Sequence, residues 1–187
     1  MIVVDYKLTG IELLTRMQVV NAVKRALRRM GEYWHEAFAW KRFTAEGGQE
    51  YGFKPRRYTY DNKKRKYFGE ALPLVFRGDT RDELLSENTK ARIRVTRDTV
   101  RIPMPTRINQ FVSRYGIKPA DEIKRVSRAE LDVLQENLVV WIEGELNSEV
   151  PAHLRNQGFT GGSVKRLSIK TFRGKRNANP VERRKAA

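Results

Sequence analysis

The sequence of 187 residues contains no cysteine and only two histidines. The absence of cysteine excludes disulfide frameworks, cysteine-ligated zinc and iron–sulfur sites, and thiol nucleophiles. Two histidines are too few for a multi-histidine metal site within one chain. No apolar run approaches the roughly 18 residues of a membrane-spanning helix, and the first residues lack the basic and long apolar regions of a secretory signal. We therefore expect a soluble protein of one domain, or of one domain with an arm.

The net charge is strongly positive, at +16, and it is unevenly distributed. Residues 54–66 carry a net +6 and residues 148–187 a net +8, whereas residues 67–147 are neutral. Blocks of like charge usually contact nucleic acid or an acidic protein partner, although a solvated tail is an alternative for the C-terminal block. We predict a core domain at residues 1–147, with a basic loop at 51–68 and a basic extended C-terminal arm from residue 148.

A long amphipathic helix is predicted near the N-terminus, at about residues 11–40, with a possible break at Gly31. Thr9 and Glu12 have the spacing of a capping box, in which each side chain accepts a hydrogen bond from a free backbone N–H. Apolar residues then recur every three or four positions, which is the period of one helix face. The predicted apolar stripe consists of Leu13, Met17, Val20, Val23, Leu27, Met30 and Trp34.

A second long helix is predicted to begin at a capping box of Ser127 and Glu130 and to end near Asn147. Its leucines, together with Ile142, share one face. A shorter helical turn is expected at residues 119–125.

Residues 91–96 and 99–104 each alternate between apolar and polar side chains, which predicts a β-hairpin. Pro103 indicates a sheet edge or a strand end, because proline cannot donate to a ladder. Residues 164–172 give only a weak strand signal. The predicted fold class is α+β: a long N-terminal amphipathic helix and a second C-terminal helix packed on a small antiparallel sheet with a β-hairpin, plus the extended basic arm.

The residues 51–68 interleave aromatic rings with cations. This composition suits stacking on bases and contact with phosphates. It equally suits a loop held against a neighbouring subunit. The candidate residues for contact with DNA or a partner are Lys54, Arg56, Arg57, Lys63, Lys64, Arg65, Lys66, Lys165, Arg166, Lys170, Arg173, Lys175 and Arg176.

No recognisable active site is present in the sequence, which has neither a P-loop nor a dinucleotide-binding glycine fingerprint. His35 is expected to be packed or solvated, and His153 exposed. Asp79, Asp82 and Glu83 could hold magnesium in a nuclease. At a helix start beside arginines, however, such carboxylates are better explained as helix caps and ion-pair partners. We therefore predict a protein that is not an enzyme and has no cofactor and no metal.

Several features follow one another in the middle of the chain: Pro73-Leu-Val-Phe-Arg-Gly78, then Asp79-Thr-Arg-Asp-Glu-Leu-Leu85, the hairpin, and Ile102-Pro-Met-Pro105. This order, over roughly residues 35–110, resembles the virion-morphogenesis and tail-completion proteins of tailed bacteriophages. Two positions depart from that pattern, since Arg77 replaces a small hydroxyl residue and Thr80 replaces a leucine.

The resemblance implies a structural virion protein, a neck or tail-completion component that forms a ring between head connector and tail. Its partners would be copies of itself, in a hexamer or larger ring, other phage neck and tail proteins, and packaged DNA through phosphate contacts. It would be made in the host bacterial cytoplasm and end in the virion, without membrane contact. The alternative is a non-specific nucleic-acid-binding protein that uses the basic loop and arm.

Overall fold

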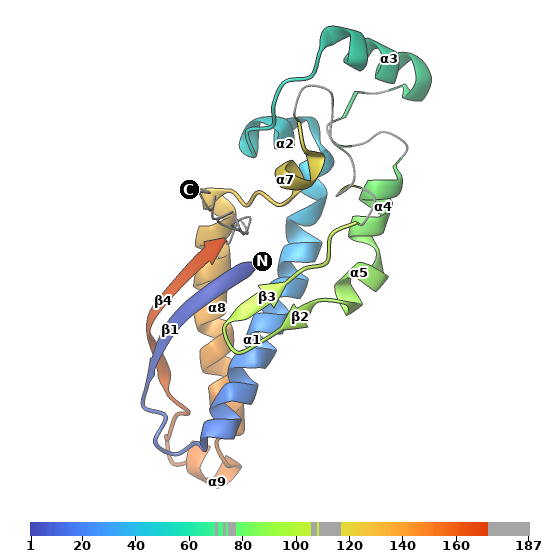
Figure 1. Ribbon diagram of the computed structural model, residues 1–187. Helices are drawn as coiled ribbons and strands as arrows, with labels where there is room; N and C mark the ends of the chain where they lie inside the picture. The colour runs from blue at the N-terminus through green and yellow to red at the C-terminus, as the bar shows by residue number, and fades with distance from the viewer. Residues whose placement is uncertain (70, 73, 75–77, 106–107, 109–116, 172–187) are drawn as a thin grey trace, which may run out of the picture.

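Two long helices packed on one face of an antiparallel sheet form the centre of the molecule (Figure 1). The computed structural model describes residues 1–69, 71–72, 74, 78–105, 108 and 117–171. The helices are α1 (Arg16–Ala37) and α8 (Arg128–Glu149). The α+β fold class and both long helices are confirmed.

The sheet has four strands in the order β2-β3-β1-β4. Its first two strands, β2 (Arg94–Val95) and β3 (Thr99–Arg101), form the predicted hairpin, which is shorter than expected. The central strand β1 (Ile2–Thr9) pairs with both β3 and β4 (Ser163–Thr171).

The strand β4 changes the expected domain boundary. It pairs antiparallel with β1 from one end to the other, with one irregularity between Lys7 and Leu8. Residues 163–171 therefore belong to the sheet, and the folded body continues beyond residue 147 rather than giving way to an extended arm. The local signal was weak because cations separate the inward-facing apolar residues of β4. Its partner strand also lies at the opposite end of the sequence.

The N-terminal capping prediction for α1 was wrong by six residues. Thr15 caps the helix, and its side chain and that of Gln18 form the capping box. Thr9 instead ends β1, with its hydroxyl 3.2 Å from that of Ser163. Leu13 lies before the helix, and Met17 lies in its first turn, outside the core. They are 45% and 68% exposed and do not join the buried stripe.

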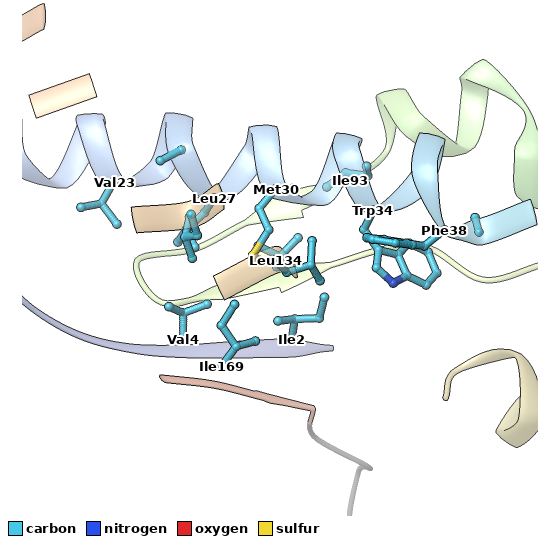
Figure 2. Close-up of a cluster of buried hydrophobic side chains, with 14 of the residues drawn as sticks. Ile2, Val4, Val23, Leu27, Met30, Trp34, Phe38, Ile93, Leu134 and Ile169 are labelled. Atoms are coloured by element: carbon cyan, nitrogen blue, oxygen red, sulfur yellow. The ribbon is translucent and has the colours of Figure 1, made fainter. Parts of the chain in front are cut away.

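The core lies between α1, α8 and the inner face of the sheet (Figure 2). The predicted stripe of α1 is buried from Val23 to Trp34. Gly31 does not break α1. A Cβ atom there would lie 2.9 Å from Val100 Cγ1, so glycine allows the helix to approach the hairpin closely. The capping box of Ser127 and Glu130 is confirmed at the start of α8. The side chains that α8 buries in the core are Leu134, Leu138, Ile142 and Leu146.

Shorter elements connect these parts. A 3-10 helix, η1 (Ala39–Phe43), and α2 (Ala45–Glu50) follow α1. The segment expected to be a basic loop instead contains α3 (Tyr58–Phe68). Further short helices in the described ranges are α4 (Asp79–Leu85), α5 (Glu87–Ala91), α7 (Pro119–Ile123) and α9 (Ala152–Arg155).

Gly78 is the N-cap residue of α4, with a φ of 90°, so Asp79 does not cap this helix. Most of the segment Pro73–Arg77, which contributes to the phage resemblance, lies outside the described residues. None of the helices in the described ranges is long and apolar enough to cross a membrane.

Candidate functional site

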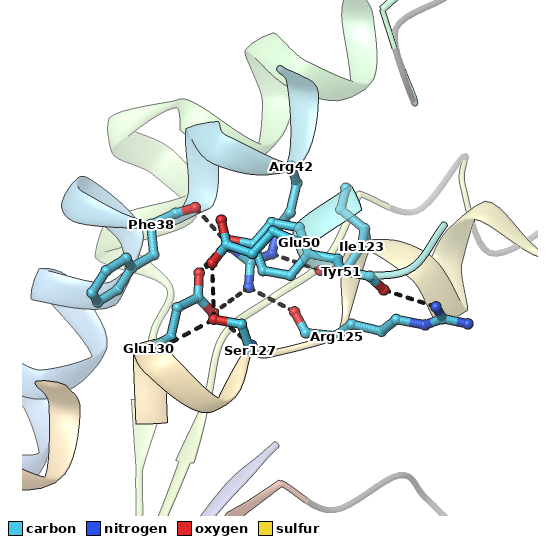
Figure 3. Close-up of polar contacts among 8 residues, drawn as sticks. All are labelled: Phe38, Arg42, Glu50, Tyr51, Ile123, Arg125, Ser127 and Glu130. Atoms are coloured by element: carbon cyan, nitrogen blue, oxygen red, sulfur yellow. Dashed lines mark hydrogen bonds and ion pairs between the residues drawn. The ribbon is translucent and has the colours of Figure 1, made fainter. Parts of the chain in front are cut away.

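A buried ion pair joins η1, which follows α1, to the start of α8 (Figure 3). The guanidinium of Arg42 donates to both carboxylate oxygens of Glu130, at 2.8 and 3.0 Å. The two side chains are 0% and 1% exposed. The same guanidinium also donates to the backbone carbonyls of Phe38, Ile123 and Arg125. The charge of Arg42 is thus compensated by one carboxylate and three carbonyl groups, as a buried cation requires.

Two aromatic rings flank the guanidinium of Arg42. Its central carbon lies 4.4 Å from the ring centres of both Trp34 and Tyr51, within the range of cation–π attraction. The hydroxyl of Tyr51 donates to Glu130 at 2.5 Å. Burial, followed by this hydrogen bond, raises the pKa of Tyr51 well above its usual value. The phenol therefore stays protonated and acts as a donor.

A second set of polar contacts extends from this pair towards α3. Glu122 of α7 is buried and forms an ion pair with Arg56 at 2.5 Å. It also accepts a hydrogen bond from the backbone N–H of Lys54. Arg125 donates to the carbonyls of Tyr51 and Gly52. Since these groups contact one another and the backbone, we interpret the network as a structural clamp that fixes the segment leading into α3.

The helix α3 carries most of the first group of predicted contact residues. It lies at one end of the molecule, beyond α2 and α7 (Figure 1). Lys63, Arg65 and Lys66 are exposed on it, and Lys54 and Arg57 are exposed before it.

Two of the predicted contact residues have structural roles instead. Lys64 is buried, and its ammonium donates to the carbonyl of Leu72. Arg56 is engaged by Glu122. Sequence reasoning did not separate these two because a run of cations does not indicate which members point inward.

The second group lies on β4, away from α3 (Figure 1). Lys165, Arg166 and Lys170 are exposed there, and Lys170 forms an ion pair with Asp5 at 3.1 Å. Arg173, Lys175 and Arg176 lie outside the described residues. The structure therefore places the two basic segments in separate regions rather than in one patch.

Three further cations were missed by the sequence analysis. Lys7, Arg94 and Arg101 are exposed on β1, β2 and β3. The available signal was the strand alternation itself, since each occupies a polar position beside a buried or half-buried apolar residue. The alternation was used to predict the hairpin, and the chemistry of its outward positions was not considered.

The predicted acidic cluster lies on α4, and the two histidines lie on α1 and α9. Asp79, Asp82 and Glu83 are exposed on α4, and Arg81 forms an ion pair with Asp82 at 3.2 Å. Within the part of the chain that the structure describes, no group of three His, Asp or Glu side chains is arranged to hold a metal ion.

His35 is buried, so the first of its two predicted environments, packed rather than solvated, is confirmed. Its Nε2 donates to the carbonyl of Leu84 at 2.7 Å, so the imidazole joins α1 to α4. His153 is exposed on α9, as predicted.

Comparison with known proteins returns no matching family model, no matching curated protein and no matching solved structure. The function is therefore inferred from the contact surfaces of this chain.

Proposed function

We propose that the protein is a structural assembly subunit that forms a ring with copies of itself, as a neck or tail-completion component of a tailed bacteriophage. The observation that carries this proposal is the environment of α3. Among the α3 side chains that the structure describes, only Lys64 is buried. An isolated helix shorter than about 12–15 residues is marginal in water, and helices in proteins gain most of their stability from packing. The 11 residues of α3 therefore favour a role in which a partner covers them.

The exposed residues of α3 are of the types that make strong protein contacts. Tyr58 and Tyr67 are 79% and 71% exposed, and Tyr60 is also exposed. Tyrosine and arginine are enriched at protein interfaces and dominate their binding energy. Arg65 lies among these tyrosines.

The same chain also offers a surface of opposite charge. Exposed carboxylates follow one another on α4 and α5, at Asp79, Asp82, Glu83 and Glu87. Contact between the cations of one copy and the carboxylates of the next would be electrostatically complementary. A ring needs such a heterologous interface, in which two different surfaces of each subunit meet. The ring and the phage connector themselves come from the sequence resemblance.

Native mass spectrometry tests assembly directly. We expect the wild-type protein to give a mass of six or more 21.8 kDa subunits and Tyr58→Ser/Tyr67→Ser to remain a monomer. Leu13→Ser/Met17→Ser is the matched control, since it removes exposed apolar side chains from the N-terminal side of α1. A monomeric wild-type protein, or equal loss of assembly in the control, would contradict the proposal.

A charge exchange tests the pairing of the two surfaces. Lys63→Glu/Lys66→Glu should prevent assembly, and the further changes Asp82→Lys/Glu87→Lys should restore it. Failure of this restoration would refute the contact with α4 and α5. Co-purification with phage neck or tail particles tests the virion assignment, and rings that are absent from such particles would argue against it.

A further inference from the structure

One face of the sheet is free of the two long helices and carries an excess of cations. On β1, Ile2 and Val4 point into the core, so Val3, Asp5 and Lys7 point to the opposite face because strand side chains alternate. Both α1 and α8 lie on the core side.

The strand register places like charges directly opposite each other on this outer face. Arg94 of β2 pairs with Arg101 of β3, and Lys7 of β1 pairs with Arg166 of β4. Residues directly opposite in an antiparallel pair have Cα atoms about 4.5–5.5 Å apart. Like charges in this position destabilise a sheet. Two such pairs in one small sheet therefore lower the stability of the fold. Their presence points to a role other than folding, namely the binding of anions.

The positive charge is weakly compensated. Asp5 is the one carboxylate that alternation places on the outer face of β1, and it is engaged by Lys170. At the other end of the face, the strand register places Arg101 directly opposite Arg94. Cations thus gather at both ends of β1.

We propose that this outer sheet face binds the phosphate backbone of duplex DNA without reading its sequence. Arg101 follows Val100, which lies opposite Ile2, so the two cation pairs are separated along the strands by about six residue steps, or about 20 Å at about 3.3 Å per residue. Duplex DNA carries one phosphate charge per about 1.7 Å of helix axis, so a face of this length lies beside several phosphates. Hydroxyl groups of Ser168 and Thr99 lie on the same face and add donors of a type that contacts phosphate.

The composition of the face favours nucleic acid over an acidic protein. A specific protein interface is usually centred on buried aromatic or large apolar anchors. The outward positions of the sheet offer only Val3 as an apolar side chain. Backbone contacts to DNA need charge and hydrogen-bond donors alone, and the net charge of +16 adds long-range attraction.

The test is fluorescence anisotropy with a labelled 20-base-pair duplex over a series of salt concentrations. The variants are Arg94→Gln/Arg101→Gln and Lys7→Gln/Arg166→Gln. Each should bind more weakly than wild type and lower the magnitude of the slope of log K against log salt by about 1.8, since each phosphate contact contributes about 0.9. The matched control, Arg16→Gln/Lys24→Gln, removes two exposed cations from α1 and should leave the slope unchanged.

Two further measurements separate binding from folding and from assembly. Each Gln variant should melt at or above the wild-type temperature, because a repulsive pair is removed. The charge-conserving Lys7→Arg/Arg166→Lys should retain the wild-type slope. The sheet-face variants should keep the wild-type mass in native mass spectrometry, so a failure of ring assembly leaves this proposal unaffected.

Three outcomes would overturn the proposal. The first is a wild-type slope in both sheet-face double variants, and the second is an equal reduction in the α1 control. The third is a wild-type protein that does not bind the duplex but binds polyglutamate, which would identify the face as a surface for an acidic protein.

Discussion

Replacing Glu130 with glutamine should destabilise the fold by about 3 kcal/mol, because it leaves the Arg42 guanidinium buried without a counter-charge. Removing one partner of a buried ion pair costs about 3–5 kcal/mol. Glutamine has nearly the same shape and retains one oxygen as an acceptor. Arg42 also keeps its three backbone carbonyl partners. The loss should therefore lie at the lower end of that range.

Arg42→Met should lower the free energy of unfolding by more than Glu130→Gln does, by about 5 kcal/mol. This change leaves the carboxylate of Glu130 buried and removes the donor from three carbonyl groups, and each buried group without a partner carries its own desolvation penalty. Arg42→Met/Glu130→Gln should lose less than the two single variants added together, because the charged carboxylate is then absent.

Urea unfolding at pH 7, followed by circular dichroism, measures these changes. With a slope of about 2 kcal/mol per molar urea, Glu130→Gln should lower the unfolding midpoint by about 1.5 M. The matched control is Glu32→Gln, which breaks an exposed pair with Arg28 and should cost about 0.5 kcal/mol or less. A loss below about 1 kcal/mol for Glu130→Gln, or a loss equal to the control, would refute the role of the buried charge.

Three other experiments test separate parts of the structure. Unfolding free energy should fall above about pH 10, by up to about 1.4 kcal/mol per pH unit, because Tyr51 ionises in the unfolded chain while its raised pKa keeps it protonated in the fold. Tyr51→Phe should reduce that fall in a pH series of urea unfolding, and an unchanged pH dependence would contradict it. Gly144→Ala should raise the melting temperature, since a Cβ there contacts nothing and alanine favours a helix by about 1 kcal/mol over glycine. Gly161→Ala should lower the melting temperature, because its Cβ would lie 2.2 Å from a backbone carbonyl oxygen. Equal shifts in the two variants would refute this contrast. A chain ending at Gly162 lacks β4 and should lose the cooperative thermal transition seen in the full chain, and a transition of undiminished sharpness would show that β4 is dispensable.

The helices and the hairpin could be predicted because their signals are local. The stripe from Val23 to Trp34 follows the helix period, and Ser127 with Glu130 forms a capping box within four residues. The start of α1 was predicted too early because the Thr9–Glu12 pattern resembles a cap. Pairing with β4 commits Thr9 to the sheet instead.

The candidate contact residues were predicted only in part. The cations of α3 and β4 were found by composition, but Lys64 and Arg56 turn towards the protein. The cations Lys7, Arg94 and Arg101 were not identified as contact residues, because each lies singly within an alternating strand. Strand pairing places all three on one face of the sheet, with Arg94 opposite Arg101 and Lys7 opposite Arg166.

By itself, the sequence determined the fold class, the two long helices and the hairpin, because periodicity, caps and residue types are properties of neighbouring positions. Only the tertiary structure decided that β4 joins the sheet, that Arg42 and Glu130 form a buried pair, and that cations lie opposite each other on the outer face. These features depend on contacts between segments that are far apart in the sequence, such as β1 and β4, which lie near opposite ends of the described chain. The positive charge was visible from composition, whereas its placement on α3 and on the outer sheet face required the fold.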